Sequence, residues 1–219
     1  MTRVKSVLFD LDGTLVDTAP DLGRALNLLR ARHGLAPLLE ELIRPQASHG
    51  ARGLLSLGFG IGPENGQFGP LREEFLQLYA DNISGHSRPF EGVLDMLAQL
   101  EAMGVLWGVV TNKPARFTEP LLSILDLADR ATCIVSGDTC PLPKPHPCPL
   151  LHAAKEIGHK PEECLYVGDA ARDIEAAVAA NMPALVAMWG YLDPTDQPQD
   201  WGAHGLINTP GQILDYLSV

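Results

Sequence analysis

The chain has 219 residues, a mass of 23.6 kDa, a formal net charge of −11 and a pI of about 4.9. This acidic balance argues against nucleic acid or an anionic membrane surface as a partner. The length allows one large domain, or a core with a smaller second domain. The four cysteines are scattered and no apolar run is long enough for a membrane span, so we expect a cytoplasmic protein. The sequence leaves open whether it is a monomer or a homodimer.

The first predicted element is a short apolar strand, Val7 to Phe9, that runs into two acids, Asp10 and Asp12. A strand that is apolar on both faces is typical of a buried parallel sheet. Alternation along an extended backbone would place the two carboxylates on the same side, close enough to share a cation. Open α/β sheets bind ligands at the carboxyl ends of their strands, which favours a functional site here. A simple turn with a helix N-cap is the alternative.

Residues 16–87 show helical periodicity and no strand-like alternation. We predict one helix that starts near residue 18 and stops near residue 34, and shorter helices near residues 39–43, 51–57 and 71–79. We therefore predict that this segment is a helical insertion. Its two connections to the core would let it move as a hinged lid. Within it, His49 and Arg52 lie among small residues, where an arginine could form forked bonds to a carboxylate or phosphate. A solvated turn with an ordinary surface arginine is the alternative.

From residue 90 onward strands and helices alternate, which predicts a parallel sheet. A strand over residues 105–110 ends at Thr111 and Asn112, where a hydroxyl and backbone N–H groups could cradle a phosphate. Ordinary turn chemistry would give the same residues. A strand near residues 132–135 precedes a proline-rich stretch, residues 141–149, whose stiff extended backbone would hold Lys144 in a fixed place. The alternative is a stiff surface linker with a solvated lysine.

A further strand, residues 164–167, is followed by Gly168, Asp169 and, four residues later, Asp173. If a helix starts here, Asp173 points back to the side of Asp169. Together with the acids at the first strand, this pair favours a Mg²⁺ site, because Mg²⁺ takes oxygen ligands. We also predict a strand at 184–187, a loop over 193–204, and a last helix capped at Thr209 with Ile213, Leu214 and Leu217 inward.

Four motifs in this order resemble those of the haloacid dehalogenase-like hydrolases, most of which are magnesium-dependent phosphatases. They are Asp10-Leu11-Asp12-Gly13-Thr14-Leu15, Thr111-Asn112, Lys144-Pro145, and Gly168-Asp169 with Asp173. The resemblance implies an α/β fold with a doubly wound, Rossmann-like parallel sheet formed by residues 1–15 and 88–219. Residues 16–87 would form the inserted all-helical cap domain.

The resemblance also implies residue roles. Asp10 would be the nucleophile, Asp12 the general acid and base, and Lys144 the cation that offsets negative charge. Thr111 and Asn112 would contact the phosphoryl oxygens, and His49 and Arg52 would contact the substrate from the cap. Asp10, Asp12, Asp169 and Asp173 would hold Mg²⁺.

These roles predict a phosphoric monoester hydrolase that acts on a small phosphorylated metabolite through an aspartyl-phosphate intermediate. Residues 14–21 and 111–114 resemble phosphoglycolate phosphatases, which suggests 2-phosphoglycolate as the substrate. Residues 48–60 and 200–203 resemble phosphatases of N-acetylmuramic acid 6-phosphate. Another sugar-phosphate phosphatase, a sugar-phosphate mutase, or a phospho-accepting signalling module of a different class are the remaining alternatives.

Overall fold

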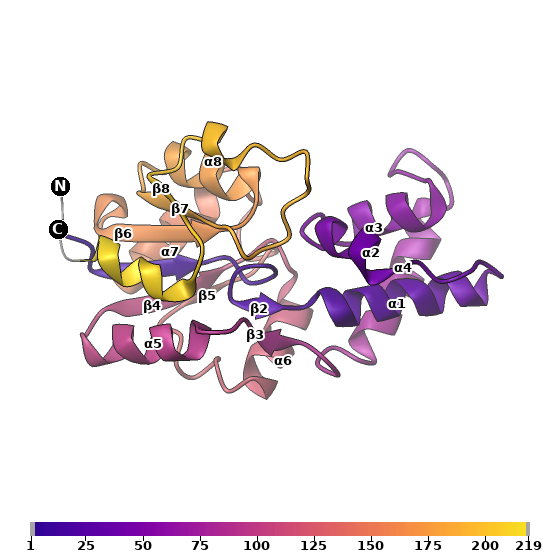
Figure 1. Cartoon of the computed structure of the whole chain (residues 1–219), viewed down its shortest axis with the longest axis horizontal. Helices are drawn as coiled ribbons and strands as arrows, with labels where there is room; N and C mark the ends of the chain where they lie inside the picture. Colours follow the sequence, from indigo (N-terminus) through magenta and orange to yellow (C-terminus); the bar gives the residue numbers. More distant parts are fainter. Residues whose placement is uncertain (1–2, 218–219) are drawn as a thin grey trace. The chain divides into compact units, whose positions relative to one another are not determined.

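The structure is a computed structural model that describes residues 3–217 and divides the chain into two compact units. The core unit comprises the chain up to Val16 and from Pro89 onward, and the helical unit spans Asp17–Arg88. Where the chain passes between the units, β2 (Val16–Asp17) pairs with β3 (Arg88–Pro89) (Figure 1). Within residues 3–217, no helix is both long enough and apolar enough to cross a membrane.

The core unit is built on a parallel sheet with the strand order β5-β4-β1-β6-β7-β8. The strands are β1 (Ser6–Phe9), β4 (Leu106–Val110), β5 (Ile134–Val135), β6 (Cys164–Gly168), β7 (Ala184–Ala187) and β8 (Gly205–Ile207). The predicted doubly wound parallel α/β fold is confirmed. Edge strand β8 has only three residues, which is too short for a periodic signal, and the sequence did not predict it.

Helices cover both faces of this sheet, and Figure 1 shows α5 and α8 on opposite sides of it. The core helices are α5 (Val93–Ala102), α6 (Ala115–Ile124), α7 (Cys148–Ile157) and α8 (Ala171–Ala179), with the 3-10 helices η1 (Pro161–Glu163), η2 (Pro198–Asp200) and η3 (Pro210–Tyr216). The last predicted helix is therefore a tighter 3-10 helix. Ile213 and Leu217 are buried as expected, but Leu214 is only half-buried.

The position of β1 in the middle of the sheet explains why its apolar residues are buried on both faces. Leu8 packs into a cluster with residues of α7 and α8, and Val7 and Phe9 point to the other face. In register, Phe9 lies beside Val109 of β4 and beside Val167 of β6. The carboxyl ends of these three strands therefore meet at one edge of the sheet.

The helical unit consists of α1 (Ala19–Arg32), α2 (Glu40–Ala47), α3 (Gly50–Phe59) and α4 (Phe68–Ala80). Pro20 lies in the first turn of α1, where its missing N–H costs no hydrogen bond. Helix α1 packs against the other three, and the unit has its own apolar interior, which includes Leu26, Leu54 and Phe75.

Asp21 ties the start of α1 to the segment that leaves the helical unit. Its buried carboxylate accepts hydrogen bonds from the backbone N–H of His86 at 3.0 Å, and from the N–H and hydroxyl of Ser87 at 2.8 and 2.7 Å. Burial by itself would raise the pKa of Asp21, but the bonds from Ser87 and His86 outweigh it and lower the pKa. Asp21 thus contributes to stability as an ionised carboxylate.

We predict that Asp21→Asn lowers the free energy of unfolding by about 2 kcal/mol at pH 7, because one oxygen that accepts hydrogen bonds becomes an N–H donor. A carboxylate with a lowered folded pKa stabilises the protein above its unfolded pKa of about 3.9, and this contribution is lost as the pH falls through the folded pKa. Urea unfolding should therefore show a gap from wild type that closes below about pH 4. Asp81→Asn, at an exposed residue of the same unit, is the control. An equal gap at pH 3 and pH 7 would contradict this assignment.

Candidate active site

The candidate site lies at the edge of the sheet where β4, β1 and β6 end. Asp10 follows β1, Thr111 follows β4 and Asp169 follows β6. The backbone continues the sheet for one more residue, because the Asp10 N–H donates to the Val167 carbonyl at 2.9 Å. Neighbouring parallel strands thus bring together residues that are far apart in sequence, at the place where such sheets bind ligands.

Asp10, Asp169 and Asp173 form an acid cluster at this edge. Their carboxylates each offer one oxygen within 4.8 Å of the others, and all three residues are buried. Asp173 lies in the first turn of α8 and fits against Gly168, where an added Cβ would be only 2.4 Å from the Cβ of Asp173. A glycine at the end of β6 is therefore needed for Asp173 to approach. Three buried acids require a compensating cation.

Lys144 supplies that positive charge from the proline-rich loop. Its buried ammonium lies 2.9 Å from Asp10 Oδ1 and 2.7 Å from Asp173 Oδ1. It also donates to the Val110 carbonyl at 2.8 Å and to the Tyr166 hydroxyl at 2.7 Å. Such complete pairing is what makes a fully buried ammonium tolerable.

The side chain of Asn112 holds the backbone of Lys144 in place. Its amide nitrogen donates to the Lys144 carbonyl, and its amide oxygen accepts from the Lys144 N–H, both at 2.9 Å. The side-chain amide therefore positions the lysine. Thr111 directs its hydroxyl oxygen to the N–H of Lys113 at 3.1 Å. The predicted contacts of Thr111 and Asn112 with phosphoryl oxygens stay predictions.

Burial and mutual repulsion raise the pKa values of the clustered acids, whereas nearby positive charges lower them, and the balance differs from one acid to the next. Burial raises the pKa of Asp10, although the Lys144 charge acts against it. Burial, with the charges of Asp10 and Asp173, raises the pKa of Asp169 to about 7. Burial also acts on Asp173, but Lys144 and Arg172 outweigh it and lower the pKa of that carboxyl. Lys144 and Arg172 therefore favour the ionised form of Asp173, whereas burial and the neighbouring carboxylates disfavour the ionised form of Asp169.

This donor set fits a divalent cation. Hard cations such as Mg²⁺ and Ca²⁺ take oxygen ligands at about 2.0–2.6 Å, and three carboxylate oxygens within 4.8 Å of one another match that need. Burial and the charges of Asp10 and Asp173 raise the pKa of Asp169, and a nearby positive charge would act against that shift. The acid cluster could therefore hold a metal ion.

The side chain of Asp12 points elsewhere than the sequence suggested. Strand β1 ends at Phe9, and the chain then turns so that the N–H of Val16 reaches the Leu11 carbonyl at 2.9 Å. Alternation does not extend through such a turn. The Asp12 carboxylate lies 2.9 Å from the Lys113 ammonium, and in the part of the chain that the structure describes it is not in the acid cluster. Its role as a metal ligand stays a prediction.

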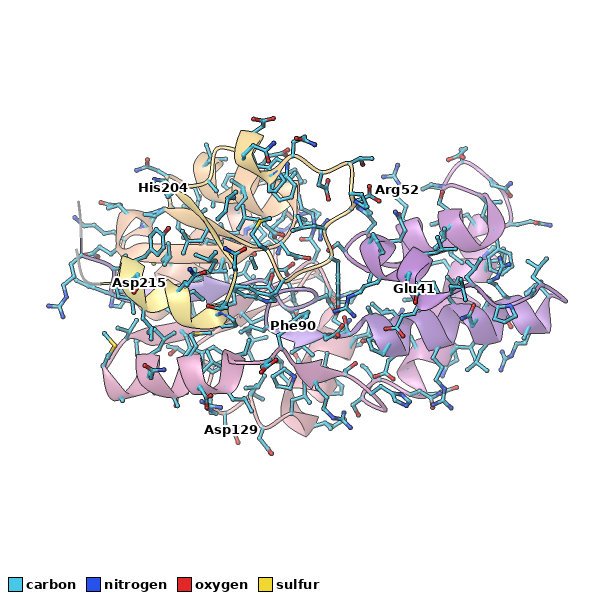
Figure 2. The ribbon with its side chains drawn as sticks, in the orientation of Figure 1. Glu41, Arg52, Phe90, Asp129, His204 and Asp215 are labelled. Carbon is cyan, nitrogen blue, oxygen red and sulfur yellow. The ribbon has the colours of Figure 1, made fainter. Side chains whose placement is uncertain are left out.

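His49 and Arg52 belong to the helical unit. His49 immediately precedes α3, and Arg52 lies in the first turn of that helix (Figure 2). Both side chains are exposed. Their predicted contacts with a substrate stay predictions.

Comparison with known proteins supports the interpretation of these residues as an active site. A profile described as haloacid dehalogenase-like hydrolase matches residues 7–187, a range that includes all four motifs. The chain belongs to this family. It is 41% identical over 215 residues to an N-acetylmuramic acid 6-phosphate phosphatase of Pseudomonas aeruginosa, with 98% of this chain and 95% of that protein covered.

Other haloacid dehalogenase-like relatives carry a different substrate in their names. The chain is 44% identical over 208 residues to a phosphoglycolate phosphatase of Xylella fastidiosa, with 94% of this chain and 90% of that protein covered. The crystal structure of a predicted phosphoglycolate phosphatase from Haemophilus somnus 129PT superimposes with a TM-score of 0.86, at 28% identity, and 98% of each chain is covered.

Sequence reasoning missed several residues that surround the four family motifs. Tyr166 lies inside a strand, where an aromatic residue signals only packing, yet its hydroxyl contacts Lys144. Lys113, whose ammonium pairs with Asp12, follows directly after Asn112. A charged residue between the end of a strand and a proline was the only sequence signal for this role. Arg172 stands within the fourth motif, next to Asp173, and contributes a second positive charge to the cluster.

We predict that Lys144→Met in metal-free buffer lowers the free energy of unfolding by about 3–5 kcal/mol, because it leaves buried carboxylates without their cation. Adding Asp173→Asn to this variant should recover part of the loss, since one of the buried charges is then removed. Urea unfolding measures both, with Lys155→Met, at an exposed lysine of α7, as the control. A Lys144→Met protein as stable as Lys155→Met would show that the ammonium does not neutralise the cluster.

Proposed function

We propose that this protein is a phosphatase that removes the phosphate from a small phosphorylated metabolite. The observation that carries the proposal is the acid cluster at the end of β1, in which Asp10 lies 2.9 Å from the Lys144 ammonium. The chain's membership of the haloacid dehalogenase-like hydrolases supports the proposal. It is also supported by the relatives named as phosphatases, which align with nearly the whole chain.

Asp10 is the proposed nucleophile. Its carboxylate attacks the phosphorus, the bond to the leaving oxygen breaks, and an aspartyl-phosphate forms. Water then attacks this intermediate and releases inorganic phosphate. A carboxylate and a phosphate repel one another, and the Lys144 ammonium offsets this repulsion because it already lies against Asp10 Oδ1.

Asp12 is the proposed general acid and base. It donates a proton to the leaving oxygen in the first step and takes one from the attacking water in the second. A dehalogenase would need neither step, so an acid two residues after the nucleophile favours phosphoryl transfer. The Lys113 ammonium, 2.9 Å from the Asp12 carboxylate, supports this role because the ion pair restricts the position of the acid.

We propose Mg²⁺ as the cation of the site, held by carboxylates of Asp10, Asp169 and Asp173. Mg²⁺ held there would supply positive charge that offsets the charge of the phosphate and of the transition state. The side chains of the cluster orient it, and Lys144 provides the remaining compensation. Such a reaction takes place in the cytoplasm if the substrate is an intracellular metabolite.

For the substrate we propose 2-phosphoglycolate. The 44% identity to a protein named phosphoglycolate phosphatase favours it. N-acetylmuramic acid 6-phosphate is the second candidate, favoured by 41% identity to a protein of that activity over 98% of this chain. The acid cluster would contact only the phosphate, which both compounds share. Specificity constants measured side by side for the two compounds would decide between them.

We predict that Asp10→Asn abolishes turnover of p-nitrophenyl phosphate with Mg²⁺ while the protein stays folded. An amide is nearly isosteric with a carboxylate but is not a useful nucleophile, and removing one of three clustered acids relieves repulsion. Steady-state rates and thermal unfolding are measured on fresh protein whose mass excludes deamidation. Asp129→Asn, at an exposed residue of the core unit, serves as the control (Figure 2). Substantial activity in the Asp10→Asn protein would rule out this nucleophile.

We propose that Arg52 binds the part of the substrate that is remote from the phosphate. Its exposed guanidinium makes no hydrogen bond or ion pair with any residue in the described range 3–217, which leaves its fork available for a carboxylate. Both candidate substrates carry a carboxylate. Binding energy from such a remote group can be expressed in the transition state.

We predict that Arg52→Ala lowers kcat/KM for the carboxylate-bearing substrate by roughly ten- to two-hundred-fold, the equivalent of about 1.5–3 kcal/mol for a charge-assisted bond. The rate with p-nitrophenyl phosphate, which has no carboxylate, should hardly change. Arg72→Ala, at an exposed arginine of α4, is the matched control. Equal losses on both substrates would assign Arg52 a structural role, and no loss on either would make it an ordinary surface residue.

A further inference from the structure

The segment Trp189, Gly190 and Tyr191 begins two residues after the end of β7 and belongs to none of the four family motifs. It follows the carboxyl end of a strand of the same parallel sheet, so it reaches the same edge as the acid cluster. Its contacts go to Asp169 and to the turn that follows Asp10. We call these three residues the 189–191 segment.

Backbone and indole N–H groups connect the 189–191 segment to the site. The N–H of Tyr191 donates to Asp169 Oδ2 at 2.8 Å. The indole N–H of Trp189 donates to the carbonyl of Thr14 at 3.0 Å, and the Thr14 hydroxyl donates to Asp169 Oδ1 at 3.3 Å. Both oxygens of Asp169 are thus oriented, one by the segment itself and one by a residue that the segment holds.

Gly190 is the residue of this segment that leaves room for Asp169. A Cβ on Gly190 would lie 2.2 Å from the Cβ of Asp169 and 2.6 Å from the carbonyl oxygen of Gly13. Neither atom is the end of a flexible side chain, so a small movement cannot relieve the clash. A Cβ on Gly13, across the site, would lie 2.2 Å from Asp169 Oδ2. The Asp169 side chain is therefore enclosed between two glycines, and only Gly13 belongs to a family motif.

We propose that the 189–191 segment positions Asp169 and thereby sets the affinity of the acid cluster for a divalent cation. The proposal rests on the metal site put forward under Proposed function. Partners that orient a ligating carboxylate change metal affinity by about 10- to 100-fold when they are lost. The tilted packing of the Tyr191 ring against Phe90, with centroids 6.2 Å apart, anchors the far end of the segment.

Two variants test this role by different means. Gly190→Ala introduces the Cβ that collides with Asp169. Trp189→Phe keeps an aromatic ring but removes the N–H that bonds the Thr14 carbonyl. Their matched controls are Gly211→Ala, where an added Cβ meets nothing within 4 Å, and Trp107→Phe, which removes the indole N–H that bonds Glu101.

The measurement is Mn²⁺ binding to each purified protein by electron paramagnetic resonance, which reads the free ion directly and needs no turnover. Folding is checked by thermal unfolding in EDTA. In parallel, the Mg²⁺ concentration for half-maximal activity, kcat and KM are measured with p-nitrophenyl phosphate. We expect Gly190→Ala to weaken Mn²⁺ binding at least tenfold, and Trp189→Phe to weaken it severalfold. The required Mg²⁺ should rise in parallel, with little change in KM at saturating Mg²⁺, and both controls should match wild type.

The results separate this proposal from the one on which it rests. If wild type binds no Mn²⁺, the metal site fails and this proposal fails with it. If wild type binds Mn²⁺ and folded Gly190→Ala binds it equally well, the metal site stands and the positioning role is overturned. Should Gly190→Ala not fold, Trp189→Phe decides, because unchanged Mn²⁺ affinity in that variant overturns the role. A loss in Trp107→Phe as large as that in Trp189→Phe would also overturn it.

Discussion

The site depends on the placement of one buried cation among several buried acids. Parallel strands bring Asp10 and Asp169 to one edge, and the first turn of α8 adds Asp173. Without a compensating charge these carboxylates would repel one another in a poorly solvated place. The ammonium of Lys144 lies within 2.9 Å of two of them, and its loop is held by Asn112 from a different strand end. Charge compensation therefore links the strand ends, the proline-rich loop and α8 into one structure.

Much of the fold and of the site was predictable because both depend on where strands end. Apolar runs that stop at polar residues identified β1, β4 and β6, and a parallel arrangement then required Asp10, Thr111 and Asp169 to share an edge. Asp173 was predicted from its spacing to Asp169, on the condition that a helix starts there, and from the fourth family motif. These inferences need only the order of elements along the chain and the geometry of a parallel sheet.

The rest depends on side-chain direction and on contacts between distant segments, which spacing does not encode. The direction of Asp12 is set by a turn after β1, where alternation no longer applies. Asn112 is a polar residue at a strand end, where the sequence favoured a contact with phosphate. In the structure its side-chain amide forms hydrogen bonds with the Lys144 backbone. Gly190 stands between two aromatic residues in a loop, and only the three-dimensional structure reveals that it faces Asp169. Strand β8 is too short for any pattern.

The central position of β1 also has a consequence for the biosynthesis of the protein. Ser6 to Phe9 are made well before their partners on both sides, which begin at Leu106 and Cys164. The helical unit is continuous from Asp17 to Arg88 and has local contacts, so it can form while β1 still lacks neighbours. Strand β1 therefore stays unpaired until β4 has been made, and during that time its apolar residues are the kind of exposed segment that favours aggregation.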